Sequence, residues 1–403
     1  MEVTASRETL KVDDCSDPNS RGIKRSANLS IDVCQKQCKE EKDETGPTCT
    51  KRQSSTSVNS QQNKLRLRKV AYVWNEEMGE VCDLLPRVPQ REYVDFLEFL
   101  NDEDDSEKEQ ERKEEFGMNH DCPSVPRIFD VAKSVTAASL RGVQALVSNE
   151  CQVAINWTGG WHHGRRDEAA GFCYMNDVVI SLLQLTQTYK RVLYIDLDLH
   201  HGDAVQDAFA HTPKVMTVSF HKHSPGFYPG SGNVDDVGHG RGRYYSVNLP
   251  LQDGMTDVLF FSLFKGVLMK VQKIYQPSVV VIQCGADTLV GDHMNCFNLT
   301  PSGIANCVNY ILHWNIPMLL LGGGGYNTPN TARCWTLLTA VAVGVRLNSE
   351  IPDHEFFLDY GPDYQLEISP SNRQNLNTKQ YLSKIVPTIF NNLDQLKPVS
   401  KEK

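Results

Sequence analysis

Short apolar runs alternate with longer amphipathic segments from about Asp130 onward, and this alternation restricts the architectures open to the chain. Apolar runs of about four to eight residues are typical of buried strands, whereas longer segments with apolar residues at helical spacing are typical of helices. Residues 279–284 show the first pattern and residues 257–275 the second. Strands separated by helices form a parallel sheet with helices on both faces. The sequence therefore predicts a single α/β domain around a mostly parallel central sheet.

The same patterns predict where the elements lie. Strands are expected at residues 70–74, 153–156, 191–197, 215–220, 279–284 and 318–321. Helices are expected at residues 133–148, 177–189, 202–210, 257–275, 301–314 and 330–345. The charged run at residues 101–115 is interpreted as a solvated loop or as the exposed face of a helix.

The two ends of the chain differ from its centre in composition. Residues 1–68 contain no Phe, Tyr or Trp and are rich in Ser, Thr, Lys and Glu. Such a segment cannot bury enough apolar surface to offset the entropy lost on ordering. We therefore predict a disordered extension at residues 1–68, a folded domain at 69–395 and a flexible end at 396–403. The basic run at residues 64–69 is interpreted either as a nuclear import signal or as a solvated linker.

The composition also limits the partners and the compartment. The formal net charge of −9 does not indicate direct binding to nucleic acid, and an acidic surface suits a basic peptide. The twelve cysteines lack disulfide-like spacing, and no secretory segment follows Met1, which favours a reducing compartment, cytosol or nucleus. Cys34 and Cys38 are interpreted as free thiols. No apolar stretch is long enough to span a membrane.

Four segments that carry chemically active residues follow the carboxyl ends of predicted strands. In open α/β sheets this edge is where ligands bind, and four unrelated segments are not expected to meet there by chance. They are residues 159–163 (GGWHH), Asp198 with His200, residues 285–287 (GAD) and residues 322–326 (GGGGY).

Asp198, His200 and Asp287 form a candidate metal site. Positions i and i+2 of an extended segment point the same way, so Asp198 and His200 face one point, and Asp287 arrives from a neighbouring strand. Two carboxylates and one imidazole leave open positions on a divalent ion, as catalytic sites do. Zn²⁺ fits such a site, and Fe²⁺ or Mn²⁺ also could. Either aspartate alone could instead cap a helix, but His200 beside them favours the metal.

His162 and His163 are candidates for acid–base catalysis. A single histidine is more often structural, but two adjacent ones can pair with Asp196 and Asp203 of the metal segment. A carboxylate on one ring nitrogen fixes the tautomer and raises the basicity of the other nitrogen. One imidazole can then act as general base, while the other stays charged and stabilises developing negative charge.

The glycine run before Tyr326 and a few aromatic residues complete the candidate site. Four consecutive glycines let the backbone approach closely and deliver the hydroxyl of Tyr326 to an oxyanion, although a simple tight turn is the alternative. Phe172 and the pair Phe227 and Tyr228 could form aromatic walls, for which core packing is the alternative. An apolar tunnel above a metal suits a long methylene stem that ends in an amide.

With these motifs together, the chain resembles the class I histone deacetylases, the zinc-dependent branch of the arginase-deacetylase fold. The resemblance runs from about Asp121 to about Ile368. Met294, residues 349–354 and the lack of a long acidic C-terminal tail resemble one subtype of the class. The matching stretches are NWTGGWHHGRRDEAAGFCYMNDV, RVLYIDLDLHHGDAVQDAF, SFHKHSPGFYPGSG, QCGADTLVGD and LGGGGYNTPNTARCWT.

The resemblance implies a hydrolase that removes acetyl or longer acyl groups from lysine side chains of histones and other proteins. Its partners would be acetylated lysine peptides such as histone tails, and no corepressor can be named. It would act as a regulator of chromatin and a repressor of transcription in the nucleus and cytoplasm. The alternatives are an acetylpolyamine or other small-amide hydrolase, and a catalytically impaired isoform that binds acyl-lysine.

The resemblance also implies a role for each site residue. Zn²⁺ would be bound by Asp198, His200 and Asp287. His163 would be the general base and then the acid, with His162 as its electrostatic partner, while Asp196 and Asp203 support the two imidazoles. The substrate would contact Asp121, Gly171, Phe172, Tyr228, Met294 and Tyr326. One K⁺ would lie at Asp196, Asp198, His200, Ser219 and Phe220, and a second at Phe209, Thr212, Val215 and Tyr245.

Two departures from the family pattern stand out. His120 occupies the place of a tyrosine, so contacts at the rim are expected to differ. Residues 70–91 resemble the family's first strand and the start of its next helix, but residues 92–96 then resemble a segment several dozen residues later. A helix and its following connection are therefore expected to be missing after about residue 91, as in a splice form or a gap in the gene model.

Overall fold

The computed structural model describes residues 68–73, 90–100, 106–118 and 121–396, all within one compact unit, Lys64–Lys403. The predicted disorder of the N-terminal extension and the expected loss of a helix both fall largely outside the described residues. So do His120, Cys34 and Cys38. Of the C-terminal segment predicted to be flexible, only residue 396 is described.

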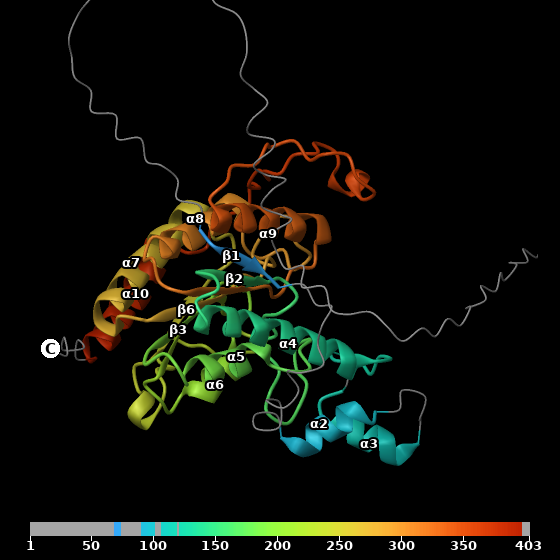
Figure 1. Ribbon diagram of the computed structural model, residues 1–403. Helices are drawn as coiled ribbons and strands as arrows, with labels where there is room; N and C mark the ends of the chain where they lie inside the picture. The colour runs from blue at the N-terminus through green and yellow to red at the C-terminus, as the bar shows by residue number, and fades with distance from the viewer. Residues whose placement is uncertain (1–67, 74–89, 101–105, 119–120, 397–403) are drawn as a thin grey trace, which may run out of the picture. The chain divides into compact units, whose positions relative to one another are not determined.

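A parallel β-sheet forms the centre of the molecule (Figure 1). Its strands run in the order β1-β2-β7-β6-β3-β4-β5, and every neighbouring pair is parallel. The predicted α/β fold with a mostly parallel sheet is therefore confirmed. The strands are β1 (Val70–Tyr72), β2 (Val153–Asn156), β3 (Val192–Asp196), β4 (Val215–Lys222), β5 (Ser246–Leu251), β6 (Val279–Gln283) and β7 (Met318–Leu321).

Helices cover both faces of this sheet (Figure 1). One face carries α4 (Ile128–Val147), α5 (Asp177–Leu185) and α6 (Asp203–Phe209). The other carries α7 (Asp257–Tyr275), α8 (Pro301–Leu312), α9 (Thr328–Val343) and α10 (Lys379–Asp394). Shorter elements are α2 (Arg91–Glu98), α3 (Glu107–Glu115) and the 3₁₀ helices Gly240–Gly242 and Phe357–Tyr360.

The alternation of side chains along β3 shows how the sheet divides the core. Leu193 and Ile195 belong to the apolar cluster formed with α7, α8, α9 and α10. Val192 and Tyr194 belong to the cluster on the opposite face, with α4, α5 and α6. Successive side chains of a strand point to opposite faces, so a strand buried on both faces is apolar throughout.

The predicted strands and helices agree with the structure to within a few residues, but β5, α2, α10 and the two 3₁₀ helices were not predicted. β5 contains Pro250, which argues against a central strand, yet β5 lies at the edge of the sheet, where proline is tolerated. α10 contains Pro387 in its interior, and α2 is short. For the charged run, the structure bears out the helix alternative, because α3 begins at Glu107.

The described helices and cysteines bear on two expectations, the lack of a membrane-spanning segment and the lack of disulfide-like spacing. Among the described residues, no helix has both the length and the apolar character needed to cross a membrane. The cysteines in this part of the chain are free and buried, in agreement with the absence of disulfide-like spacing; they are Cys122, Cys151, Cys173, Cys284, Cys296, Cys307 and Cys334.

Candidate active site

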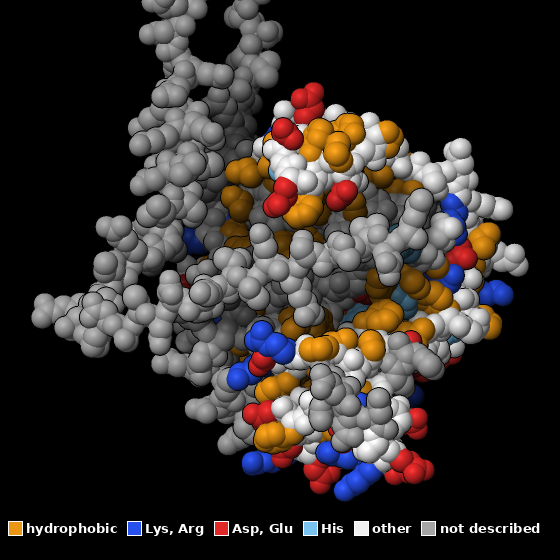
Figure 2. Space-filling model, turned by 90° about the vertical axis from the view of Figure 1, so that its right-hand side faces the viewer, with side chains coloured by type: hydrophobic (Ala, Val, Ile, Leu, Met, Phe, Trp, Pro, Cys, Tyr) orange, Lys and Arg blue, Asp and Glu red, His pale blue; other side chains and the backbone are white. Residues whose placement is uncertain are grey.

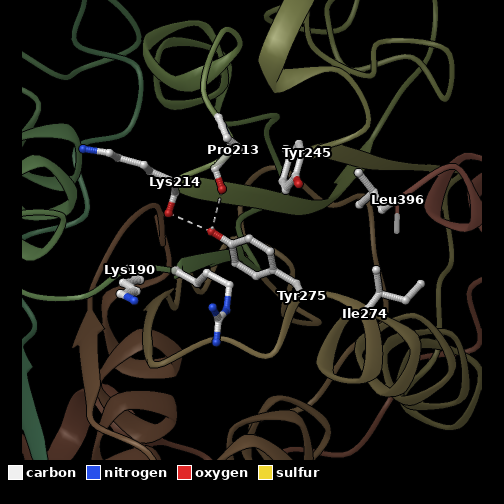
Figure 3. Close-up of a pocket in the computed structure, with 8 residues that line it drawn as sticks. Lys190, Pro213, Lys214, Tyr245, Ile274, Tyr275 and Leu396 are labelled. Atoms are coloured by element: carbon white, nitrogen blue, oxygen red, sulfur yellow. Dashed lines mark hydrogen bonds between the residues drawn. The ribbon is translucent and has the colours of Figure 1, made fainter. Parts of the chain in front are cut away.

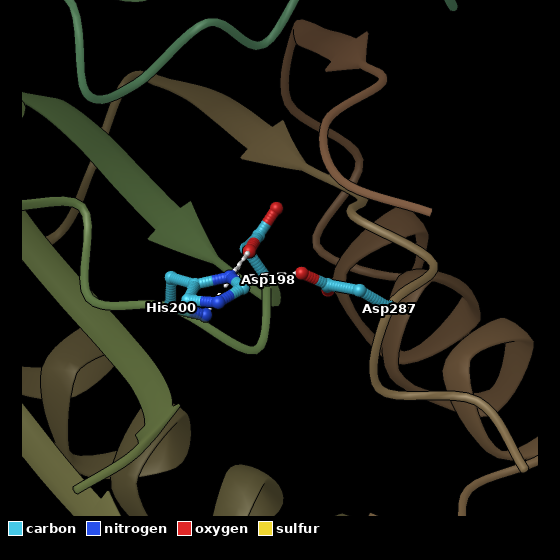
Figure 4. Close-up of side chains that lie close together, drawn as sticks. All are labelled: Asp198, His200 and Asp287. Atoms are coloured by element: carbon cyan, nitrogen blue, oxygen red, sulfur yellow. Dashed lines mark hydrogen bonds and ion pairs between the residues drawn. The ribbon is translucent and has the colours of Figure 1, made fainter. Parts of the chain in front are cut away.

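Asp198, His200 and Asp287 meet at the carboxyl edge of the sheet. Strands β3 and β6 are paired neighbours, with Asp196 opposite Gln283, so the loops that follow them leave the sheet side by side. The ligand atoms of the three residues all lie within 4.8 Å of one another (Figure 4). The Nδ1 atom of His200 lies 3.2 Å from Asp198 Oδ1 and 3.0 Å from Asp287 Oδ2. The predicted convergence of these residues is confirmed.

The donor set of this cluster fits a divalent cation. All three side chains are buried, and two buried carboxylates beside one imidazole require a compensating positive charge. Burial and the charge of Asp198 raise the pKa of Asp287. Burial alone would lower the pKa of His200, but its bonds to Asp198 and Asp287 outweigh burial and raise that pKa to about 10. The cluster therefore attracts positive charge, which a metal ion supplies by competing with protons.

The glycine run approaches the metal ligands with its backbone. The N–H of Gly324 donates to Asp198 Oδ2 at 2.9 Å. A Cβ atom on Gly324 would lie 2.5 Å from Asp287 Oδ2, closer than side chains approach one another. The same oxygen of Asp198 also accepts a bond of 2.7 Å from Gln283 Nε2. Close approach is thus the reason for glycine at this position.

Each of the two adjacent histidines is paired with its own carboxylate. His162 Nδ1 lies 2.8 Å from Asp196 Oδ2, and His163 Nδ1 lies 2.8 Å from Asp203 Oδ1. Burial opposes charge on His162, but Asp196 outweighs it and raises the pKa of His162 to about 9. Burial and the charge of His162 lower the pKa of His163 to about 4. At neutral pH the two rings therefore differ in charge, with His162 cationic and His163 neutral.

Tyr326 lies at the end of the glycine run, between the metal ligands and an aromatic side chain. Its ring meets that of Phe172 edge-on, with centroids 5.9 Å apart. Its backbone N–H donates to Asp292 Oδ2 at 2.7 Å. Burial and the charges of Asp198 and Asp287 raise the pKa of the Tyr326 hydroxyl. The hydroxyl therefore stays protonated and can donate.

Aromatic rings surround the histidines and the metal ligands. Phe227 stacks flat on His200, with centroids 5.2 Å apart and planes at 5°. Tyr228 meets His163 edge-on at 5.0 Å. Phe172 is 58% exposed, so the alternative that it packs in the core is wrong. Figure 2 shows hydrophobic side chains gathered around a recess in which histidine side chains are visible.

Comparison with known proteins agrees with this geometry. The histone deacetylase domain matches residues 47–342, most of the chain. The chain belongs to the histone deacetylase family. It is 47% identical to histone deacetylase 8 of Danio rerio over 375 residues, covering 84% of this chain and 99% of that protein. It is 51% identical over 304 residues to histone deacetylase 8 of Xenopus laevis, and this match covers 75% of this chain and 93% of that protein.

Histone deacetylase 1 of Homo sapiens is 46% identical over 305 residues, covering 76% of this chain and 63% of that protein. The expected class I membership, with most similarity to the histone deacetylase 8 subtype, is confirmed. The arginase-deacetylase fold expected for such a protein agrees with the parallel sheet and its two helical layers.

The residues expected at the rim of the site differ from one another in burial and surroundings. Asp121 is exposed, directly before the buried Cys122. Met294 is half-buried against the apolar core, and its N–H donates to Asp292 Oδ1 at 2.9 Å. Gly171 has φ +52°, and a Cβ atom there would lie 2.7 Å from the His163 ring, so the backbone passes directly beside the histidine.

The residues of the first expected potassium site lie on β3 and β4 and in the loop after β3, which carries Asp198 and His200. Asp196 ends β3 and is paired with Ser219 of β4, with Phe220 next to it. The Ser219 hydroxyl shares a bond of 2.8 Å with His221 Nδ1. This pairing brings the expected ligands Asp196 and Ser219 together at the end of β3.

The residues of the second expected potassium site lie at or near the amino ends of β4 and β5, at the edge of the sheet opposite the metal cluster. Phe209 ends α6 and Val215 begins β4, while Thr212 lies between them and Tyr245 precedes β5. Beside these loops, the hydroxyl of Tyr275 donates to Lys214 O at 2.7 Å and to Pro213 O at 3.2 Å (Figure 3). The end of α7 is thereby attached to the loop before β4.

Two buried carboxylates that the sequence did not single out hold the loops of the site. Asp177 accepts bonds from the N–H groups of Gly160, at 3.1 Å, and Trp161, at 2.8 Å, just before the histidine pair. It also accepts a bond of 2.5 Å from Ser139 Oγ. Asp292 holds Tyr326 in a similar way. Neither aspartate belongs to a recognisable spacing, because its partners are backbone groups of distant segments.

Proposed function

We propose that this chain hydrolyses acetyl-lysine amides in histones and other proteins, with Asp198, His200 and Asp287 as the ligands of Zn²⁺. The observation that carries the proposal is the arrangement of one three-residue cluster, two histidines that are each paired with a carboxylate, and Tyr326 at the same sheet edge. Fe²⁺ or another divalent ion would suit the same ligands. Family membership and the names of the relatives support the reaction class.

The chain's own residues account for the proton transfers. Zn²⁺, when bound, supplies a Lewis acid that polarises the amide carbonyl and acidifies a water molecule. The neutral His163 accepts a proton from the attacking water at Nε2, because Asp203 occupies its Nδ1. It then donates this proton to the leaving lysine amine. Tyr326 donates a hydrogen bond to the carbonyl oxygen as negative charge develops there.

His162 has a supporting part in this proposal. Asp196 keeps it charged, and its ring lies 4.0 Å from that of His163. A fixed positive charge stabilises the negative transition state and disfavours early protonation of His163. Tyr194 donates to the same Asp196 oxygen at 2.7 Å and thereby helps to orient the carboxylate.

The aromatic walls favour a lysine side chain as substrate. Phe172 beside Tyr326 and Tyr228 beside His163 provide apolar ring surfaces near Gly171, which suits four methylene groups that end in an amide. Asp121, exposed at the rim, would hold the substrate backbone, and Met294 would contact its side. We further propose K⁺ at the two sites implied by the family, and location in the nucleus and also in the cytoplasm.

The test is turnover of an acetyl-lysine histone-tail peptide by Zn²⁺-loaded protein, compared with turnover of an acetylated polyamine. Faster turnover of the peptide supports the proposal. Preference for the polyamine would assign a small-amide hydrolase. Peptide binding without turnover would assign an acyl-lysine binding protein.

A further inference from the structure

The chain presents Tyr326 on a segment that cannot hold its own conformation. Gly323 and Gly325 have φ values of +150° and +146°, a region that residues with side chains rarely adopt. Glycine also has the largest backbone freedom of all residues. The position of the Tyr326 hydroxyl must therefore be imposed by contacts from outside the glycine run.

Asp292 supplies these contacts. Its Oδ2 atom accepts bonds from the N–H groups of Tyr326, at 2.7 Å, and Asn327, at 3.0 Å. Its Oδ1 atom accepts a bond of 2.9 Å from the N–H of Met294. The carboxylate is 4% exposed, so water does not replace these bonds readily. One side chain thus fastens the tyrosine loop to the turn that carries Met294.

A second set of bonds joins the same two segments. Asn327 Nδ2 donates to Gly291 O at 2.9 Å, and Asn330 Nδ2 donates to Val290 O at 3.2 Å. Asn327 also caps α9 by accepting a bond of 3.1 Å from the N–H of Asn330. The turn at residues 290–294 is therefore attached both to the end of the glycine run and to the first turn of α9.

We infer that Asp292 is a positioning residue that sets the reactive placement of Tyr326 and couples it to the Met294 turn at the rim. This inference rests on the proposed deacetylase function. Asp292 does not touch the reacting atoms; it acts through the backbone of Tyr326. Its removal leaves the metal ligands in place but lets the hydroxyl move, and a displacement of about 1 Å can lower the rate on the order of 100-fold.

The variant Asp292→Asn tests the inference. It keeps the size of the side chain, but one oxygen becomes an NH₂ group that faces N–H donors and cannot accept from them. We expect kcat on an acetyl-lysine peptide to fall about 10- to 100-fold, with KM and Zn²⁺ content close to those of the unmodified protein.

Asp257→Asn is the matched control. Asp257 accepts from Thr300 N–H at 2.9 Å and Thr300 Oγ1 at 2.6 Å and has no bond to Tyr326, so its replacement should leave kcat unchanged.

A double variant separates positioning from a general effect on folding. If Asp292 acts through Tyr326, Asp292→Asn should cost little further rate when Tyr326 is already phenylalanine. Equal losses in both backgrounds would overturn the inference, as would a normal kcat for Asp292→Asn. An unmodified protein without any deacetylation would instead contradict the proposed function.

A milder variant covers the case in which Asp292→Asn does not fold. Asn327→Ser retains an oxygen that can cap α9 but is too short to donate to Gly291 O, and it adds no charge beside Asp292. We expect a smaller fall in kcat, again absent in the Tyr326→Phe background. An unchanged kcat for this folded variant would count against the coupling between the two segments.

Discussion

At the scale of single residues, Tyr326 is the clearest test of the proposed chemistry. Tyr326→Phe removes one hydroxyl donor and keeps the ring that meets Phe172. Loss of one oxyanion donor costs about 10²- to 10³-fold in rate, so we expect kcat to fall by this factor while substrate affinity changes little. Steady-state kinetics measure both.

Tyr310→Phe in α8, where the ring packs on Phe261 and Phe264, is the control. A Tyr326→Phe enzyme with near-normal kcat would exclude the assigned role.

Asp287 tests the metal site at the same scale. Asp287→Asn removes one of only three protein ligands that the structure brings together. We expect Zn²⁺ to be lost on dialysis, because two remaining ligands bind a divalent ion more weakly. Metal analysis of the dialysed protein measures this, with Asp257→Asn as the control that keeps its ion. Full retention of one ion per chain by Asp287→Asn would mean that the metal lies elsewhere.

At the scale of elements, the loop after β7 does two things at once. It donates a backbone N–H to the ligand Asp198, and two residues later it presents Tyr326. Gly324→Ala would place a Cβ atom 2.5 Å from Asp287 Oδ2 and 3.1 Å from Asp198 Oδ2, so the loop must move. Loss of partners around metal ligands weakens metal binding by about 10- to 100-fold, and we expect this for Gly324→Ala together with a lower kcat.

The control for the loop is another glycine. Gly266 lies inside α7, where an added Cβ atom would meet only Phe390 Cζ, at 3.9 Å. Gly266→Ala should keep metal affinity and raise the free energy of unfolding by about 1 kcal/mol, because alanine favours a helix interior. Titration with Zn²⁺ and thermal unfolding compare the two variants. Equal metal affinity in both would show that the loop has room for a side chain.

At the scale of the whole molecule, the segment after β1 is expected to limit the stability of the fold. The proposed loss of a helix concerns residues outside the described part of the chain. In the described part, a groove of about 550 Å³ borders α9; its lining includes Tyr72, Trp157, Trp335, Val345 and Leu347. Tyr72 is 52% exposed and Leu347 is 43% exposed. This groove includes Tyr72 of β1 and is lined largely by apolar side chains.

Inserting the helix that the family resemblance implies after about residue 91 is expected to stabilise the protein and raise its activity. Covering several hundred Å² of apolar surface at roughly 25 cal/mol per Å² contributes on the order of 5–10 kcal/mol. This is comparable to the whole stability of a typical domain. Thermal unfolding and deacetylation rates of the two chains, measured side by side, test the prediction. Equal melting temperatures and equal rates would show that the segment is dispensable.

The sequence alone determined every described strand except β5, most helices and the residues of the candidate metal site, because each depends on a short-range pattern. A strand buried on both faces must be apolar throughout, as β6 is. Asp198 and His200 converge as their i and i+2 spacing predicted, but they lie in a bend after β3, where the His200 N–H donates to Asp198 Oδ1 at 3.0 Å. Local patterns of this kind are therefore sufficient to single out the metal residues and the histidine pair. Their roles follow from the types of side chain and from the family resemblance.

Only the tertiary structure decided which segments meet and what holds them. The pairing of β3 with β6, which brings Asp287 to His200, depends on contacts between distant parts of the chain. The sequence did not predict β5, because Pro250 lacks the N–H that a central strand must donate. A strand at the edge of the sheet tolerates this loss, and only the tertiary structure shows that β5 is an edge strand. Asp177 and Asp292 bind backbone N–H groups, which every residue type except proline carries. No local pattern can encode such partners, so these two aspartates emerged only from the folded chain.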